Sequence, residues 1–420
     1  MKKVREGYKI TELGEIPNEW KIKKLGELTK VIRGASPRPK GDPRYYGGNI
    51  PRLMIADVSR DGKYVIPQID FLTEEGAKKS RPMKKGDLVI SISGTVALPT
   101  FLAVDACIHD GFMGFIEIDE SILKEFLYYQ ILYLRELLIS QATDGGVYIN
   151  LTTDIVKDFN ILVPSINEQE KIALILSTVD EQIDNVDELI QKNKELKKGL
   201  MQQLLTKGIG HTKFKKTEIG EIPEEWEVIK LSELAEIKRG ASPRPINNPK
   251  WFSENKKVGW IRISDVTKTK KYLKKTEQYL SEEGIAKSRL VKPNNLIMSI
   301  CATVGKPIIL KMEACIHDGF ILFDNLDRSR VNINYLYYLL QKKEEEFKSM
   351  GQTGTQANLN TNLVGSTLIA LPKIQEQEKM ELILSEVDEK IEEYENKKQK
   401  LEELKKGLMQ QLLTGKVRVI

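Results

Sequence analysis

Hydrophobic residues recur at alternating steps of four and three positions along two long stretches of this chain. These stretches, residues 165–206 and 373–414, are nearly the same in sequence. Such steps place side chains along one side of a helix, in the heptad pattern typical of coiled coils. Because one amphipathic helix cannot bury its apolar stripe alone, we predict two long helices that pair with each other. The predicted pairing residues are Leu176, Val179, Ile183, Val186, Ile190, Leu384, Val387, Ile391, Tyr394 and Leu401.

Polar residues and glycines interrupt this apolar pattern, and we expect the polar ones to weaken a simple continuous zipper. The polar positions of the stripe are Asn193, Lys197, Lys398 and Lys405. Gly199 and Gly407 each lie inside a segment LKKGLMQQLL, where glycine costs a helix roughly 1 kcal/mol relative to alanine. The two glycines indicate either a close approach of another backbone or a break in the helix.

The whole chain is an internal duplication. GEIPNEW at residues 14–20 returns as GEIPEEW at residues 220–226, RGASPRP at 33–39 returns at 239–245, and CIHDGF at 107–112 returns at 315–320. Each half is therefore a globular unit followed by one long helix. The period is far longer than that of solenoid repeats, so it predicts two domains, related by a pseudo-two-fold axis if the helices pair antiparallel.

Within each globular half, short apolar segments between Gly, Pro, Asn and Asp clusters predict strands. One helix is predicted after Ser121, which would cap it, and its copy begins near Asn334. The predicted fold class is α+β, with two similar domains of mixed short strands and helices. The predicted bounds are residues 1–164 for the first domain, 165–206 for the first helical spacer, 207–371 for the second domain, and 372–420 for the second spacer and the C-terminal tail.

The composition is that of an ordinary water-soluble chain. It has 420 residues, of which 40% are hydrophobic, enough for two cores. The N-terminus is charged and no long apolar run occurs, so we expect neither a signal peptide nor a membrane span, and a cytoplasmic location. Of the three cysteines, only Cys107 and Cys315 are equivalent in the duplication, while Cys301 aligns with Ser93. We therefore expect reduced thiols rather than a disulfide framework.

Positive charge is concentrated in the first part of each half. Residues 1–85 contain 20 Lys and Arg against 11 Asp and Glu, and residues 211–293 contain 19 against 12. Residues 86–165 reverse the balance, with 3 against 11. A basic surface suits a polyanion such as a nucleic-acid backbone, although solvated surface lysines would give the same counts.

No motif of a known catalytic or cofactor site occurs in the sequence. It has no phosphate-binding loop, dinucleotide-binding turn, nucleophile elbow or His-Glu-x-x-His helix, and no Asn/Asp-Pro-Pro-aromatic motif of amino-methylating DNA enzymes. Cys107 and His109, with their copies Cys315 and His317, project to one face of a predicted strand. A structural strand, a DNA contact and a metal or thiol site remain open for them, although a structural zinc site needs four ligands.

The repeated RGASPRP segments, which we term the arginine loops (residues 33–39 and 239–245), are the strongest candidates for DNA contacts. Arginine can bind a guanine edge with two hydrogen bonds, serine and lysine can reach phosphates, and proline reduces the entropy lost on docking. A structural turn with solvated arginines is the alternative. The candidate DNA-binding residues are Arg33, Ser36, Arg38, Lys40, Lys79, Arg81, Asn150, Arg239, Ser242, Arg244, Lys287, Arg289, Gln356 and Asn358.

Three motifs, in one order and over nearly the whole chain, give the sequence a family resemblance. They are I-P-x-x-W at residues 16–20 and 222–226, P-x-x-x-E-Q at 164–169 and 372–377, and LKKGLMQQLLTGKVRV at 404–419. Together they resemble the specificity subunit of type I restriction-modification systems. The resemblance implies two target-recognition domains on double-stranded DNA, with two spacers that pair as an antiparallel coiled coil.

The resemblance also implies a non-catalytic subunit, with the chemistry on its partners. Two modification subunits, which form a DNA-adenine methyltransferase, would bind S-adenosylmethionine, and restriction subunits, the translocase-nuclease, would use ATP and Mg²⁺. No cofactor or metal is expected on this chain, and no membrane partner.

The resemblance implies two properties of the DNA target. The paired helices would act as a ruler between two short half-sites with an unread gap. Because the two domains are so alike, the half-sites should share several base pairs, which makes the target quasi-palindromic. The alternatives are a coiled-coil scaffold that binds proteins, and a stand-alone nuclease or thiol enzyme built around Cys107 and His109.

Overall fold

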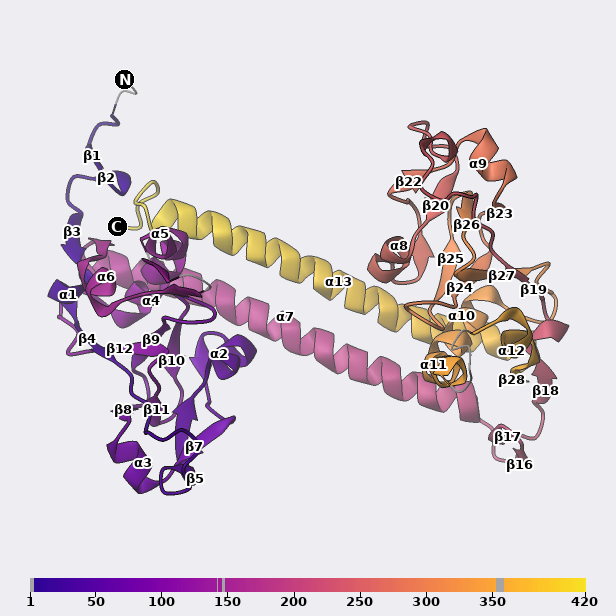
Figure 1. Cartoon of the computed structure of the whole chain (residues 1–420), viewed down its shortest axis with the longest axis horizontal. Coiled ribbons are helices and arrows are strands. Elements are labelled where there is room, and N and C mark those ends of the chain that lie inside the picture. Colours follow the sequence, from indigo (N-terminus) through magenta and orange to yellow (C-terminus); the bar gives the residue numbers. More distant parts are fainter. Residues whose placement is uncertain (1–3, 142, 146–147, 353–358) are drawn as a thin grey trace. The chain divides into compact units, whose positions relative to one another are not determined.

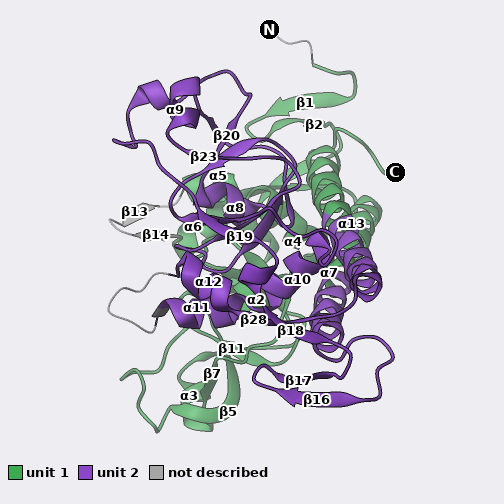
Figure 2. Ribbon diagram, turned by 90° about the vertical axis from the view of Figure 1, so that its right-hand side faces the viewer, with its two compact units in different colours: residues 1–187, 396–420 green, residues 188–395 purple. Residues whose placement is uncertain are grey.

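The structure, a computed structural model, describes residues 4–141, 143–145, 148–352 and 359–420 (Figure 1). The fold is α+β, as predicted. The chain divides into two compact units, residues 1–187 with 396–420 and residues 188–395, which Figure 2 shows in different colours. Each unit combines one domain of mixed short strands and helices with a segment of both long helices.

The first unit contains a five-stranded and a four-stranded sheet. The five-stranded sheet has the order β4 (Lys30–Arg33), β12 (Phe112–Ile116), β9 (Leu88–Ser91), β10 (Pro99–Leu102) and β6 (Tyr64–Val65). The four-stranded sheet has the order β7 (Asp70–Leu72), β5 (Tyr46–Leu53), β11 (Ala106–Ile108) and β8 (Arg81–Met83). Apolar side chains of both sheets, among them Leu53, Val89 and Phe112, form one buried cluster.

Shorter elements surround these sheets in the first unit. Three two-stranded sheets pair β1 (Tyr8–Thr11) with β2 (Gly14–Pro17), β3 (Lys21–Lys24) with β15 (Asn160–Val163), and β13 (Thr143–Gly145) with β14 (Tyr148–Asn150). The helices are α1 (Leu25–Leu28), α2 (Ile55–Asp61), α3 (Glu74–Lys78), α4 (Lys124–Tyr133), α5 (Arg135–Ser140) and α6 (Thr153–Asp158).

The second unit repeats the strand order of the two larger sheets, as the duplication requires. Its five-stranded sheet has the order β19 (Glu236–Arg239), β27 (Phe320–Asp324), β24 (Leu296–Ser299), β25 (Pro307–Leu310) and β21 (Tyr272–Leu273). Its four-stranded sheet has the order β22 (Gln278–Tyr279), β20 (Gly259–Ile261), β26 (Ala314–Ile316) and β23 (Arg289–Val291). The two-stranded sheets pair β16 (Phe214–Thr217) with β17 (Gly220–Pro223) and β18 (Glu227–Lys230) with β28 (Leu368–Leu371). The helices are α8 (Ile263–Lys268), α9 (Glu282–Ala286), α10 (Ile333–Lys342), α11 (Glu344–Gln352) and α12 (Thr361–Ser366), with short 3₁₀ turns at Leu231–Glu233 and Pro249–Trp251.

The long helices are α7 (Ile166–Lys207) and α13 (Ile374–Leu412). They pack together and run antiparallel within each unit, because residue numbers rise along one helix as they fall along the other. In the first unit Asp180 and Asp187 of α7 form ion pairs with Lys405 and Lys398 of α13. In the second unit Lys197 forms an ion pair with Asp388.

The helix predicted after Ser121 differs from the structure in two ways. The α4 helix begins at Lys124 with Leu123 as its N-cap, and Ser121 instead donates its hydroxyl to Asp119 in the preceding turn. The segment is also two helices, α4 and α5, because Leu134 between them leaves the helical conformation. The apolar pattern of residues 122–140 located this helical region but did not reveal its internal break.

No helix in the described part of the chain is both long and apolar enough to cross a membrane. The three cysteines are free thiols, with Cys107 and Cys315 buried.

Candidate nucleic-acid interface

Each arginine loop follows the end of a strand and is hydrogen-bonded to the two strands that the CIHDGF segment connects, β11 and β12 in the first domain and β26 and β27 in the second. After β4, the backbone N–H groups of Gly34 and Ala35 donate to the carbonyl oxygens of Phe112 and Ile108. A Cβ atom on Gly34 would lie 2.0 Å from the carbonyl oxygen of His109, so no larger residue fits without moving the backbone. The repetition of RGASPRP and CIHDGF in both halves therefore has a packing reason.

The second arginine loop is attached in the same way. Gly240 and Ala241 donate to the carbonyl oxygens of Phe320 and Ile316, and a Cβ atom on Gly240 would also lie 2.0 Å from a histidine carbonyl, that of His317. The two loops are therefore equivalent in backbone contacts as well as in sequence.

An aspartate organises the side chains of each loop, and sequence reasoning missed this role. In the first unit the hydroxyl of Ser36 donates to Oδ1 of Asp110 at 2.5 Å, and Nη2 of Arg38 lies 3.6 Å from Oδ2. In the second unit Ser242 donates to Oδ1 of Asp318 at 2.6 Å, and Nη2 of Arg244 donates to Oδ2 at 3.2 Å. We term these groups the aspartate clusters. The hydrogen bond from Ser242 lowers the pKa of Asp318, so this carboxylate is ionised at neutral pH.

Two further arginines extend each aspartate cluster in a row. Nε of Arg33 donates to the backbone carbonyl of Asp110, and Nε of Arg81 donates to the carbonyl of Arg33. The copies Arg239 and Arg289 make the same two contacts, at 2.7 and 2.5 Å. The structure thus brings together three predicted arginines on each domain, Arg33, Arg38 and Arg81 on the first and Arg239, Arg244 and Arg289 on the second.

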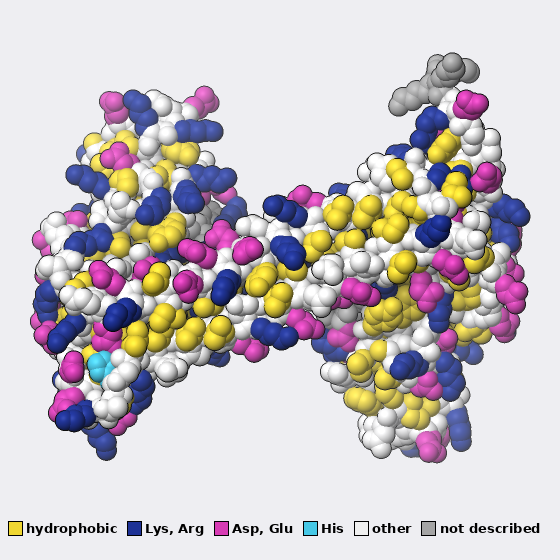
Figure 3. Space-filling model, turned by 180° about the vertical axis from the view of Figure 1, so that it is seen from behind, with side chains coloured by type: hydrophobic (Ala, Val, Ile, Leu, Met, Phe, Trp, Pro, Cys, Tyr) yellow, Lys and Arg dark blue, Asp and Glu magenta, His cyan; other side chains and the backbone are white. Residues whose placement is uncertain are grey.

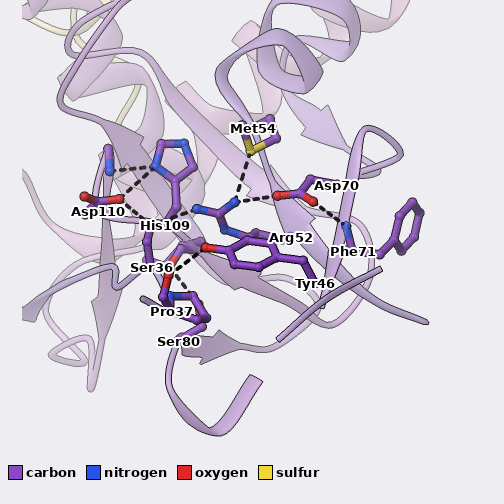
Figure 4. Close-up of polar contacts among 12 residues, drawn as sticks. Ser36, Pro37, Tyr46, Arg52, Met54, Asp70, Phe71, Ser80, His109 and Asp110 are labelled. Atoms are coloured by element: carbon purple, nitrogen blue, oxygen red, sulfur yellow. Dashed lines mark hydrogen bonds and ion pairs between the residues drawn. The ribbon is translucent and has the colours of Figure 1, made fainter. Parts of the chain in front are cut away.

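The two domains differ directly beneath the loops, and Figure 4 shows the arrangement in the first domain. Arg52 of β5 is buried in the first domain, where it donates to the Ser36 hydroxyl at 2.7 Å and pairs with Asp70 on the neighbouring strand. The same sheet positions in the second domain carry Trp260 and Gln278. The first loop therefore has an ionic anchor that the second lacks.

The remaining DNA candidates are more dispersed. Lys40 and Lys287 are exposed, whereas the ammonium of Lys79 donates to the hydroxyl of Tyr45 and lies over its ring. Asn150 is the last residue of β14. The candidates Gln356 and Asn358 lie outside the described residues.

His109 and Cys107 make contacts typical of a structural strand. Nδ1 of His109 accepts a hydrogen bond from the backbone N–H of Gly111, and burial lowers the histidine pKa. Burial raises the pKa of the Cys107 thiol, which disfavours a reactive thiolate. Among the residues that the structure describes, no group of three or more His, Cys, Asp or Glu side chains could hold a metal ion.

A partly buried polar network joins the first domain to both long helices. The hydroxyl of Tyr129 of α4 donates to Asp180 of α7 at 2.5 Å, and Lys63 donates to the same hydroxyl at 2.7 Å. Lys405 of α13 completes the network with an ion pair to Asp180. The side chains of Lys63 and Asp180 are 14% and 12% exposed, and burial lowers the pKa of Lys63.

The second unit contains the equivalent network, assembled from the opposite helices. Tyr338 of α10 donates to Asp388 of α13 at 2.7 Å, Lys271 donates to the Tyr338 hydroxyl, and Lys197 of α7 forms the ion pair with Asp388. Two lysines of the apolar stripe, Lys197 and Lys405, thus belong to networks that connect the helices to the domains, whereas Lys398 pairs with Asp187 of the other long helix. Their interpretation as interruptions that only weaken the zipper was incomplete.

The tryptophans of the family motif fasten the ends of the long helices. Nε1 of Trp20 donates to Glu168 at the start of α7, and Arg418 of the C-terminal tail pairs with the same carboxylate. In the second unit, Trp226 and His211 contact Glu376 in the same manner.

The glutamines of the motif fix the start of each long helix. Gln169 is buried, accepts from the N–H of Leu123 and donates to the carbonyl oxygens of Ser121 and Pro164. Gln377 makes the equivalent contacts to Asn332, Arg330 and Pro372. The tryptophan, glutamate and glutamine residues of these motifs therefore form the hydrogen bonds that connect the domains to the starts of the long helices.

The predicted pairing residues lie on the two long helices with different degrees of burial. Those that are buried are Leu176, Val179, Val186, Ile190, Leu384, Val387 and Ile391, and those that are partly exposed are Ile183, Tyr394 and Leu401. Gly199 and Gly407 lie within continuous helix, and a Cβ atom on either would meet nothing within 4 Å. Neither a helix break nor a close backbone approach, the two predicted explanations, is present.

Comparison with known proteins places the chain among DNA specificity subunits. A family model described as the type I restriction modification DNA specificity domain matches it twice, at residues 17–198 and 223–403. The type I restriction enzyme MjaVIII specificity subunit of Methanocaldococcus jannaschii is 27% identical over 99% of this chain and 96% of that protein. A putative MjaX specificity subunit of the same organism is 29% identical over 99% and 97%.

Solved structures share the fold over nearly the whole length. The S subunit of a type I restriction-modification system from M. genitalium has a TM-score of 0.61 at 14% identity, and the match covers 98% of this chain and 97% of that one. A second structure, described by its role in complex assembly and conformational transition of the type I restriction-modification system, has a TM-score of 0.57 at 17% identity, over 96% and 99%.

Proposed function

Because the chain belongs to the family of type I restriction-modification specificity subunits, we propose that its two domains read a bipartite DNA target. The observation that carries this proposal is the repeated arrangement of three arginines around one aspartate cluster on each domain. A guanidinium can donate two hydrogen bonds to O6 and N7 of guanine, which is the commonest specific contact in the major groove.

The arginine side chains of the loops are exposed, while the loop backbone beneath them is attached to the sheet. The side chains of Arg38 and Arg244 are 75% and 70% exposed, while Gly34 and Gly240 attach the loops beneath them to the sheet. Exposed cations on a rigid base can reach a base edge or a phosphate at a low cost in entropy. Lys40, Lys79, Lys287 and Asn150, together with Gln356 and Asn358, are proposed as flanking contacts of the same interface.

The likeness of the two domains supports a quasi-palindromic target. The arginine loops are identical in sequence and their Gly-Ala backbone is attached in the same way, so they should read the same base pairs in the two half-sites. The segments that differ, such as Arg52 with Asp70 against Trp260 with Gln278, should account for base pairs that the half-sites do not share.

Exposed leucines on the long helices support a docking surface for two modification subunits. Leu174 and Leu382 occupy equivalent positions of α7 and α13 and are 67% and 59% exposed, and Leu196 and Leu404 are 51% and 50% exposed. Figure 3 shows hydrophobic side chains, in yellow, on the exposed surface of these helices. A large apolar side chain kept in water at equivalent positions of both copies favours burial against a second protein.

The catalytic steps are proposed to belong to the partners. Modification subunits would bind S-adenosylmethionine, and restriction subunits would use ATP and Mg²⁺, with no cofactor on this chain. The present subunit contributes the reading of DNA and the positions of its partners.

Selection from randomised duplexes tests this function. The chain is assembled with a modification subunit, and bound DNA is recovered at two salt concentrations and sequenced. We expect two short half-sites at one constant gap, with affinity that falls steeply as salt rises. Insertion of helical residues before Gly199 should change the gap and leave the half-sites unchanged. Recovery of no preferred sequence, or of one uninterrupted site, would contradict the proposal.

A further inference from the structure

We propose that Asp110 and Asp318 are positioning residues that aim Arg38 and Arg244 at the same base in the two half-sites. The inference rests on the proposed function and adds a specificity role for two carboxylates that bear the wrong charge for a DNA contact. Each arginine loop therefore has a negative charge beside it, which a purely electrostatic DNA surface would exclude.

The geometry shows what each carboxylate does. It accepts from the loop serine through one oxygen and faces the loop arginine with the other, at 3.6 Å for Arg38 and 3.2 Å for Arg244. Among the described residues, each arginine contacts the carboxylate through one terminal nitrogen, Nη2. The guanidinium keeps other donors free for a base edge, and its direction is set by the carboxylate.

The carboxylates are not needed to keep the loops in place. The backbone of the first loop is attached through Gly34, Ala35 and the hydroxyl of Ser80, which donates to the carbonyl of Ala35. The side chain of Asp110 is itself 50% exposed, and that of Asp318 is 43% exposed. Their amide variants should therefore fold and keep the loop backbone.

The anchor beneath the first loop predicts an order of effects. Ser36 is also bound by the buried Arg52, so the first loop has a second restraint when the carboxylate is removed. The second domain has Trp260 at the sheet position of Arg52, so the orientation of the side chains of its loop depends more on Asp318. Asp318→Asn should therefore relax base reading more than Asp110→Asn.

The test compares Asp110→Asn and Asp318→Asn in the complex with a modification subunit, by selection from randomised duplexes. Asp318→Asn should lower discrimination by about tenfold at one base position of its own half-site, and Asp110→Asn should lower it by less at the corresponding position. In each case the other half-site is the internal control. The affected position should be the same in both half-sites, related by the two-fold. Glu120→Gln, an exposed carboxylate on the first domain, controls for the loss of one negative charge.

A second pair of variants separates positioning from stability. Arg38→Lys keeps the charge but removes the planar fork, so it should relax the same base position as Asp110→Asn, and the double variant should lose no more than the worse single variant. Three results would overturn the inference. They are a loss of discrimination in the double variant equal to the sum of the two single losses, an equal loss in both half-sites from one single variant, and a lower melting temperature with unchanged base preference. If the unmodified complex selects no bipartite sequence, the proposed function fails first, which the wild-type control reveals.

Discussion

Glycine residues of this chain occupy two opposite environments, which give opposite expectations for the same substitution. Gly199 and Gly407 are helical with open space around the missing Cβ atom, whereas Gly34 and Gly240 face histidine carbonyls at 2.0 Å. Alanine should be favourable in the helices and unfavourable in the loops.

We expect Gly199→Ala to raise the free energy of unfolding by up to about 1 kcal/mol, because alanine loses less backbone entropy in a helix. Gly34→Ala should lower it, because a Cβ atom there requires the backbone to move. Chemical denaturation of the two single variants checks the pair, and a Gly199→Ala variant no more stable than wild type would contradict the account.

His109 and His317 should make stability depend on pH just below neutrality. Burial lowers the pKa of both from the ordinary 6.5, and Nδ1 of each accepts a backbone N–H, which a protonated ring nitrogen cannot do. Their contribution is therefore complete above pH 6.5 and is lost as the pH falls below it. We expect the melting temperature to drop between about pH 7.5 and pH 5.5, and to drop less for the His109→Gln, His317→Gln variant. Equal slopes for the two proteins would show that these histidines do not contribute.

At the scale of elements, the long helices are joined to the domains by buried polar groups as well as by apolar packing. Asp180 forms ion pairs with Lys63 and Lys405 and accepts a hydrogen bond from Tyr129. Its removal would therefore leave two largely buried cations without their carboxylate partner. Lys405 is only one of the two lysines that pair with Asp180, so its removal leaves the other pair intact.

We therefore expect Asp180→Asn to destabilise the first unit by about 3 kcal/mol, and Lys405→Met, which leaves Asp180 paired with Lys63, to change stability by less than about 1 kcal/mol. Asp388→Asn and Lys197→Met provide the matched pair in the second unit. Thermal unfolding measures all four variants. An Asp180→Asn variant as stable as Lys405→Met would contradict the central position of this carboxylate.

The exposed leucines of the helices give a test of partner binding. Leu174→Glu together with Leu382→Glu should abolish co-purification of the modification subunit, because two charged side chains would enter the proposed contact. Leu189 is the matched control, since it is also exposed on α7 but is replaced by Lys397 in the second copy. Loss of the partner with Leu189→Glu, or its retention with the double variant, would remove the leucines from the docking surface.

The long helices and the two similar domains could be predicted from the sequence, whereas the aspartate clusters and the role of Lys405 could not, for physical reasons. Heptad spacing revealed both long helices because a 3.6-residue period shows in the sequence itself, and duplication revealed the two similar domains. The aspartate clusters were missed because Asp110 and Ser36 are 74 residues apart and meet only through the pairing of β12 with β4. Lys405 resembled a defect in the stripe because its partners Asp180 and Tyr129 are distant in sequence.

At the scale of the whole molecule, the duplication gives two units of the same architecture that exchange helix segments. Each unit takes its long-helix segments from both halves of the chain, and the C-terminal tail returns to the first unit, where Gly415 accepts from the hydroxyl of Tyr8. The chain thus contains the same arrangement of one domain and two helix segments twice. We therefore expect the two domains to read DNA through the same kind of surface and to bind partners at equivalent positions.

Methylation mapping of the genome by long-read sequencing, with the gene present and with it deleted, tests this central claim most directly. We predict that deletion removes one methylated motif, composed of two short half-sites that share several base pairs as inverted copies and are separated by a constant unread gap. An unchanged set of methylated motifs, or loss of a motif whose halves are unrelated, would contradict it.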